Sequence, residues 1–137
     1  MKGSVRNAAV AAAAAAAALV LGTAAANPEV PAPPAGASSQ VLQGARLYQQ
    51  HCALCHGAKG RDANVFPRPI WGPGHDIAKF GTARGLFEYV QLLMPFDDPA
   101  KIDDAAKTAI VNYMLVRNGN LKPDKPLPPG GDQTAIR

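Results

Sequence analysis

Three stretches of the chain repeat apolar residues every three or four positions, a spacing typical of amphipathic helices. Each stretch follows a side chain that can cap a helix N-terminus, namely Ser38 or Ser39, Thr82, and Asp103 or Asp104. Pro95 would end the second helix and Asn118-Gly119 the third. The apolar faces predicted by this spacing are Val41, Leu42, Ala45 and Tyr48; Leu86, Phe87, Val90 and Leu93; and Ala106, Ile110, Tyr113 and Met114.

The segment 57–81, between the first two helices, has no periodicity and is rich in glycine and proline. Its apolar residues, among them Ile70 and Trp71, nevertheless need a surface against which they can be buried. Three helices and long loops predict an all-α domain with a thin core over residues 38–119. Domains of this size usually depend on a disulfide, a metal or a cofactor for stability.

The first 26 residues have the pattern of an export signal. Lys2 and Arg6 precede an alanine-rich apolar run, and Ala24–Ala26 offers a small-residue cleavage site before Asn27. A retained membrane anchor is the alternative, although the run is short and weakly hydrophobic for a spanning helix. We expect cleavage and a periplasmic location, with membrane association only if the segment is retained.

Proline-rich segments flank the predicted domain. Residues 27–37 are expected to form an extended linker, and residues 120–137 a proline-rich C-terminal tail. The formal net charge of the 137-residue chain is +4, which falls to +2 once Lys2 and Arg6 are removed. With so small a charge and no clustered basic stripe, no nucleic-acid partner is expected.

Both cysteines of the sequence lie in one C-x-x-C-H run, from Cys52 to His56. This run is the attachment signature of c-type haem, because each thiol can bond a vinyl group and the next histidine can bind the iron. A disulfide, a thioredoxin-like redox pair and a zinc site are the alternatives. The redox pair would need βαβ units, and zinc would need ligands from His51, His56 and His75. We predict one covalent haem c, held by Cys52, Cys55 and His56.

The other axial position of the iron is open to a second side chain. Met94 is favoured because Pro95, which lacks an amide hydrogen, makes a stiff corner directly after it. His75 is the leading alternative, whereas Met114 is expected to fill the core and His51 lies on the wrong side of the motif. A thioether ligand favours ferrous iron, raises the reduction potential and closes the iron to substrates.

These residues resemble class I c-type cytochromes, in particular the small bacterial monohaem type, over residues 40–119. Besides the C-x-x-C-H run, the resemblance rests on the Met94-Pro95 corner and on Gly44, Tyr48 and Tyr113. The latter three match a glycine–aromatic contact at which the first and last helices of the family cross. The resemblance implies a small cytochrome c fold, with three main helices and long loops wrapped around one covalent haem.

The expected haem pocket includes Tyr48, Pro69, Ile70, Trp71 and Phe96. In the family, a Gly-Pro-x-Leu-x-Gly run supplies a proline carbonyl that accepts a hydrogen bond from the proximal histidine. The corresponding stretch here, residues 67–72, has its proline displaced by one position. The sequence therefore leaves open which carbonyl orients His56.

Two functions fit these observations. The first is a monohaem c-type cytochrome that transfers single electrons between redox partners in the periplasm, with a low-spin haem ligated by His56 and Met94. The alternative is a dedicated haem subunit of a periplasmic dehydrogenase, because residues 94–99 look like those of cytochrome domains in sulfite, thiosulfate and quinoprotein alcohol dehydrogenase systems. An enzyme or sensor with an open iron is least favoured, because Met94 would close the site. No independent catalytic site is seen, since the Asp97-Asp98 and Asp103-Asp104 pairs are typical of turns and helix starts.

Overall fold

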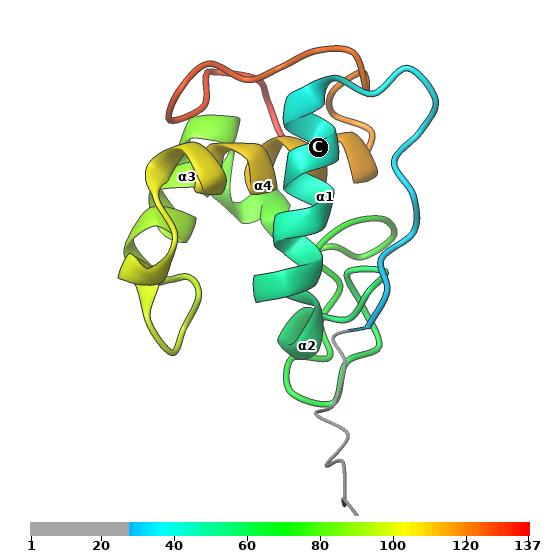
Figure 1. Ribbon diagram of the computed structural model, residues 1–137, viewed down its shortest axis with the longest axis vertical. Helices are drawn as coiled ribbons and strands as arrows, with labels where there is room; N and C mark the ends of the chain where they lie inside the picture. The colour runs from blue at the N-terminus through cyan, green and yellow to red at the C-terminus, as the bar shows by residue number, and fades with distance from the viewer. Residues whose placement is uncertain (1–27) are drawn as a thin grey trace, which may run out of the picture.

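The structure, a computed structural model, describes residues 28–137 and confirms the all-α fold (Figure 1). The elements are α1 (Ser39–His51), α2 (Ala53–His56), η1 (Ile77–Phe80), α3 (Ala83–Leu93), η2 (Pro99–Lys101) and α4 (Asp104–Arg117), where η marks a short 3-10 helix. Within residues 28–137 there is no strand, only an isolated antiparallel bridge between Thr82 and Ala135. No helix in this range is long and apolar enough to cross a membrane. The predicted export signal, residues 1–26, lies outside the described residues.

Each long helix begins at one of the predicted capping residues. The side chains of Ser38, Thr82 and Asp103 accept a hydrogen bond from the backbone N–H three residues later, at 3.3, 3.2 and 2.7 Å. Each cap satisfies a donor that the first turn of its helix cannot pair internally. At the other end, α3 stops at Leu93, directly before the Met94-Pro95 corner.

The C-terminus of α4 lies at the predicted Asn118-Gly119 signal. Gly119 has a φ of +80°, in the left-handed region that favours glycine. Its N–H donates to the carbonyl oxygen of Val116 at 3.1 Å, and the N–H of Asn120 donates to that of Leu115 at 2.9 Å. This pair of hydrogen bonds is a Schellman motif, which satisfies two of the carbonyls at the end of the helix.

Helix α1 lies across α4, and Gly44 sits at their contact (Figure 1). A Cβ atom added to Gly44 would lie 2.0 Å from the carbonyl oxygen of Ala109 and 2.9 Å from the Cβ of Tyr113. Both distances are far inside van der Waals contact, so the two backbones can approach this closely only because residue 44 has no side chain. The glycine–aromatic crossing implied by the resemblance is therefore confirmed.

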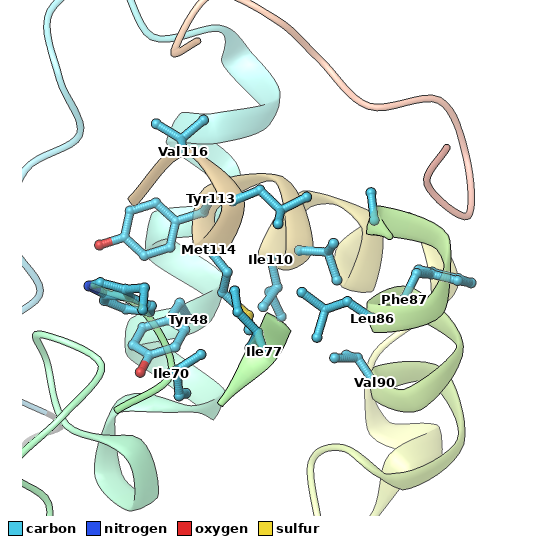
Figure 2. Close-up of a cluster of buried hydrophobic side chains, with 14 of the residues drawn as sticks. Tyr48, Ile70, Ile77, Leu86, Phe87, Val90, Ile110, Tyr113, Met114 and Val116 are labelled. Atoms are coloured by element: carbon cyan, nitrogen blue, oxygen red, sulfur yellow. The ribbon is translucent and has the colours of Figure 1, made fainter. Parts of the chain in front are cut away.

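Three aromatic rings fill the core beside this crossing: Tyr48 from α1, Tyr113 from α4 and Trp71 from the segment 57–81. The ring centroids are 5.0 Å apart for Tyr48–Trp71 and 5.7 Å apart for both Tyr48–Tyr113 and Trp71–Tyr113, in tilted or edge-to-face geometry. Figure 2 shows Tyr48 and Tyr113 at one end of the core and the apolar face of α3 at the other. The aperiodic segment 57–81 is thus anchored in the core by an aromatic side chain.

Most residues of the predicted apolar faces are buried, whereas Ala106 is half-buried and two leucines are exposed. Leu42 and Leu93 are 42% and 50% exposed, so the predicted faces of α1 and α3 are too wide. Helix α4 is buried around its whole circumference from Lys107 to Val116, so its predicted stripe is too narrow. A helix buried on every side needs cover from more than one direction.

The C-terminal segment supplies part of that cover, since it runs over the ends of α1, α4 and α3 (Figure 1). Leu127 and Ile136 are buried in the core. The N–H of Leu127 donates to Oε1 of Gln40 at 2.7 Å, and Nε2 of Gln40 donates back to the carbonyl oxygen of Leu127 at 3.0 Å. Val30, from the predicted linker, also packs against the core. Both flanking segments therefore contact the helical domain.

Candidate haem site

The C-x-x-C-H run lies at the junction of α1 and α2. Cys52 ends α1 and precedes α2, whose single turn contains Cys55 and His56. The N–H groups of Cys55 and His56 both donate to the carbonyl oxygen of Cys52, at 3.1 and 2.9 Å. Both cysteines are free thiols, and residues 28–137 contain no group of three or more His, Cys, Asp or Glu that could hold a metal ion. One helical turn thus carries two unpaired thiols and an imidazole.

Two hydrogen bonds attach this turn to the rest of the domain. Oη of Tyr48 donates to the carbonyl oxygen of Gly57 at 2.9 Å, which links the aromatic core to the end of the motif. The N–H of Phe66 donates to the carbonyl oxygen of Cys55 at 3.0 Å. The motif is therefore held both by α1 and by the segment that follows it.

The imidazole of His56 is half-buried, edge-on to the ring of Phe66 at a centroid distance of 4.9 Å. Burial lowers the pKa of His56 below its ordinary value of 6.5, which favours the neutral form that binds metals. Its Nδ1 is buried and has no hydrogen-bond partner among residues 28–137. The carbonyl oxygen of Pro69, in the displaced proline run, accepts instead from the N–H of Asp76 at 2.8 Å. In the described part of the chain, no carbonyl accepts a hydrogen bond from Nδ1 of His56.

The two thiols differ in environment, since Cys55 is exposed and Cys52 is half-buried. Burial, together with the smaller influence of the nearby Cys55, raises the pKa of Cys52 to about 12, although Lys101 acts to lower it. In the metal-free chain Cys52 is therefore a thiol at neutral pH, which disfavours redox exchange because the thiolate is the reactive form. The influence of Lys101 also places the segment after Met94 within electrostatic reach of the motif.

The candidates for the second axial position occupy different environments. Met94 lies at the C-cap of α3, partly buried against the core. Nε2 of His75 lies 3.2 Å from the carbonyl oxygen of Arg137 and 3.3 Å from Nδ2 of Asn118, beside the end of α4. Met114 is buried in the core of the domain (Figure 2). His75 is thus engaged in polar contacts and Met114 is fully packed in the core, whereas Met94 is only partly buried.

The five residues predicted for the haem pocket fall into two groups. Tyr48, Ile70 and Trp71 are buried in the core of the protein. Pro69 is half-buried in its loop, and Phe96, two residues after Met94, is 88% exposed. Ile70 and Trp71 therefore do not need haem for their burial, because side chains of the helices already cover them. Contact of these five residues with haem stays a prediction.

Large apolar side chains are exposed on the segments of both candidate ligands. Leu54 lies inside the motif and Val65 in the segment after it, while Leu93 and Phe96 lie on either side of Met94. Single exposed apolar side chains are ordinary on protein surfaces, so what matters here is their position beside the candidate ligands. Together with a neutral imidazole and two free thiols, they fit a large apolar group such as haem.

Sequence analysis missed one residue near Met94. Lys107 lies outside the predicted apolar face of α4, yet it is only 3% exposed. Its Nζ donates to the carbonyl oxygens of Gln91 and Pro99, both at 2.7 Å. Pro95 could have indicated a side-chain donor at this place, because its missing N–H leaves the carbonyl of Gln91 without its helical partner.

Comparison with known proteins decides the family. Residues 39–114 match the family described as cytochrome c oxidase, cbb3-type, subunit III. The chain belongs to this family of c-type cytochrome domains. Membership implies that the cofactor is haem c and that the cytochrome domain serves electron transfer.

Relatives of this cytochrome domain occur among dehydrogenases. It is 30% identical over 111 residues to a thiosulfate dehydrogenase of Stutzerimonas stutzeri (strain A1501), an alignment that covers 74% of this chain and 33% of that protein. Among solved structures, the sulfane dehydrogenase SoxCD of Paracoccus pantotrophus is 22% identical with a TM-score of 0.46, covering 62% of this chain and 46% of that one. The thiosulfate dehydrogenase TsdBA of Marichromatium purpuratum is 26% identical with a TM-score of 0.46, covering 62% and 19%. The chain thus spans about a third of its curated relative and less than half of each solved chain.

Proposed function

We propose that the cytochrome domain binds one haem c through thioether bonds from Cys52 and Cys55, with His56 and Met94 as the axial ligands of the iron. The observation that carries this proposal is the single helical turn that presents both free thiols and a neutral imidazole. Met94 is supported by its place at the end of α3, next to exposed apolar side chains. Haem, when bound, supplies a one-electron iron couple.

The chain contributes the geometry around that couple. Tyr48 holds the end of the motif through its hydrogen bond to Gly57, and α2 fixes His56 directly behind the second thiol. Two protein ligands would leave no open position for a substrate, which suits electron transfer rather than catalysis. A thioether ligand would also place the reduction potential higher than a second histidine would.

The attachment is tested by extracting the purified protein with acidified acetone and weighing the intact chain. We expect the haem to stay with the protein, and the mass to exceed that of the chain by one haem. Haem that leaves the wild-type protein, or a mass for two haems, would contradict the proposal. Single replacements of Cys55 and Cys52 by alanine should each leave only one thioether bond.

The second ligand is tested with matched methionine variants. Met94→Leu should lower the reduction potential, abolish the long-wavelength band of a sulfur–iron bond in ferric haem and admit imidazole or cyanide. Met114→Leu, a conservative change in the core, should keep all three properties and cost less than about 1.5 kcal/mol of stability. An unchanged spectrum and potential in Met94→Leu would show that another residue is the ligand.

We further propose that the protein works in the periplasm, as a carrier that moves electrons between redox proteins. A role as the haem subunit of a dehydrogenase is the second candidate. It is supported by the similarity of this chain to about a third of the length of a thiosulfate dehydrogenase. The carrier predicts a monomer with fast, salt-sensitive encounters, whereas the subunit predicts a stable complex. Size-exclusion chromatography of the protein purified from its native host distinguishes the two.

A further inference from the structure

The segment 92–98, called loop 92–98 below, comprises the last two residues of α3 and the connection to η2. It contains the proposed ligand Met94 and is closed at its base by one side chain. Nζ of Lys107 donates to the carbonyl oxygen of Gln91 and to that of Pro99, both at 2.7 Å. These two residues directly precede and follow the loop. A single ammonium group therefore joins the two ends of the segment that carries Met94.

The chemistry of α3 explains why a donor is needed at this position. In a continuing helix, the carbonyl of Gln91 would accept from the N–H of residue 95, but residue 95 is proline and has none. The last backbone hydrogen bond of α3 is donated by Met94 to Val90, at 3.0 Å. Lys107 supplies the missing donor, and its positive charge complements the negative end of the helix dipole.

Lys107 lies in the first turns of α4, and its side chain is buried. Side chains of a helix lean toward its N-terminus, which directs Lys107 toward the loop. A buried ammonium group costs stability unless it is fully hydrogen-bonded, so its position and that of the two carbonyls depend on each other. Charge-assisted hydrogen bonds of this length are the strong kind.

We propose that Lys107 is a positioning residue for the axial ligand: it fixes the base of loop 92–98 so that the thioether of Met94 is held ready for the iron. The inference rests on the proposed ligation by Met94. It assigns the strength of the methionine–iron bond partly to a residue that does not contact the iron.

The test uses full-length ferric holoprotein and titration with imidazole, which has to displace the Met94 thioether to bind. Lys107→Met removes the donors but keeps an unbranched apolar stem. We expect it to bind imidazole about tenfold more tightly or better, because loss of even one charged hydrogen bond can weaken the closed state by that factor. The sulfur–iron band should fade and the potential should fall. Lys107→Arg, which keeps charged donors, should restore most of the sulfur–iron band and of the reduction potential.

Lys101→Met is the matched control, because Lys101 pairs with Asp97 of the same loop at 2.6 Å but Asp97 is largely exposed. Its imidazole affinity should stay within about twofold of wild type, since exposed ion pairs contribute little. A Lys107→Met protein that melts earlier yet keeps wild-type imidazole affinity and band would overturn the positioning role. If Lys107→Met does not fold, Lys107→Gln carries the same test, and failure of both to fold would mean that Lys107 maintains the whole domain instead.

The outcomes separate this inference from the ligation itself. A wild-type protein without the sulfur–iron band, or a Met94→Leu variant that keeps it, would overturn ligation by Met94 and the inference with it. If the wild-type protein shows the sulfur–iron band and Lys107→Met retains it fully, only the role of Lys107 would be overturned.

Discussion

The α1–α4 crossing and the loop 92–98 belong to one small domain, but different interactions stabilise them. At the crossing, a glycine lets two backbones touch and three aromatic rings pack beside them. In the loop, Phe96 is 88% exposed, and the base is held by hydrogen bonds from Lys107. The crossing is completed by side chains of the chain itself, whereas the loop presents apolar surface that a cofactor would cover. The difference suggests that the crossing determines the fold and the loop tunes the site.

The largest expected effect comes from removing the cofactor. A Cys52→Ala, Cys55→Ala double variant should be largely unfolded, because a domain with so thin a core depends on a covalent apolar centre. Circular dichroism and a thermal melt measure this, with the exposed neighbour Leu54→Ala as a control that should keep its haem. Helical circular dichroism of native-like strength would instead show that the crossing folds by itself.

The next largest effect is expected at the crossing, from Gly44→Ala. Replacing glycine by alanine in a helix normally stabilises it by about 0.5–1 kcal/mol. Here the new Cβ would lie 2.0 Å from the carbonyl oxygen of Ala109, so the helices must separate. We expect a loss of about 1–3 kcal/mol or more, typical of overpacking. Urea denaturation of the holoprotein measures it, and the exposed α1 variant Gln43→Ala should change little.

A smaller effect should distinguish two buried tyrosines. Tyr48→Phe removes the donor to the carbonyl of Gly57 and should cost about 0.5–1.5 kcal/mol. The hydroxyl of Tyr113 is buried without a partner among the described residues, so Tyr113→Phe should be neutral or stabilising. Denaturant midpoints of the two holoproteins test this contrast between the link to the motif and the core beside it. Equal losses would mean that the Tyr113 hydroxyl has a partner in the holoprotein.

The smallest effect concerns a surface carboxylate in the segment 57–81. A hydrogen bond from Lys79 and the charges of Lys79 and Arg68 lower the pKa of Asp76 below its ordinary value of 3.8. A carboxyl group whose pKa is lowered in the folded state stabilises that state at pH values above the ordinary pKa. This contribution is lost as the pH falls through the lowered pKa. Asp76→Asn should therefore melt slightly earlier than wild type at pH 7, with the difference shrinking in acid and in high salt. If the difference in melting temperature between Asp76→Asn and wild type grew on acidification, the assigned direction of the pKa shift would be wrong.

Much of the helical framework could be predicted because its signals are local. Ser38, Thr82 and Asp103 cap helices through bonds that span three residues, and Gly119 ends α4 by its own backbone conformation. The C-x-x-C-H motif is similarly local, because its spacing alone places two thiols and an imidazole on one turn. Such features depend on neighbours in sequence, which a pattern can reveal.

The full burial of α4 and the burial of Trp71 could not be predicted in the same way. Trp71 packs on rings from α1 and α4 that are distant in sequence, so the expectation that haem buries it was unnecessary. The tail covers α4 through contacts such as Gln40 with Leu127, which no periodicity indicates. The burial of Lys107 could not be predicted either, because helical spacing does not record what lies beyond the N-terminus of a helix.

The sequence by itself determined the helices, their caps and the haem motif, because short-range geometry and backbone chemistry specify each of them. Only the tertiary structure decided how closely α1 and α4 approach, which surfaces the tail covers and which side chain closes the loop of Met94. Those features depend on distances between segments far apart in the chain. The absent side chain of Gly44 matters only because α4 lies against it. The buried ammonium of Lys107 likewise matters only because the carbonyls of another segment face it.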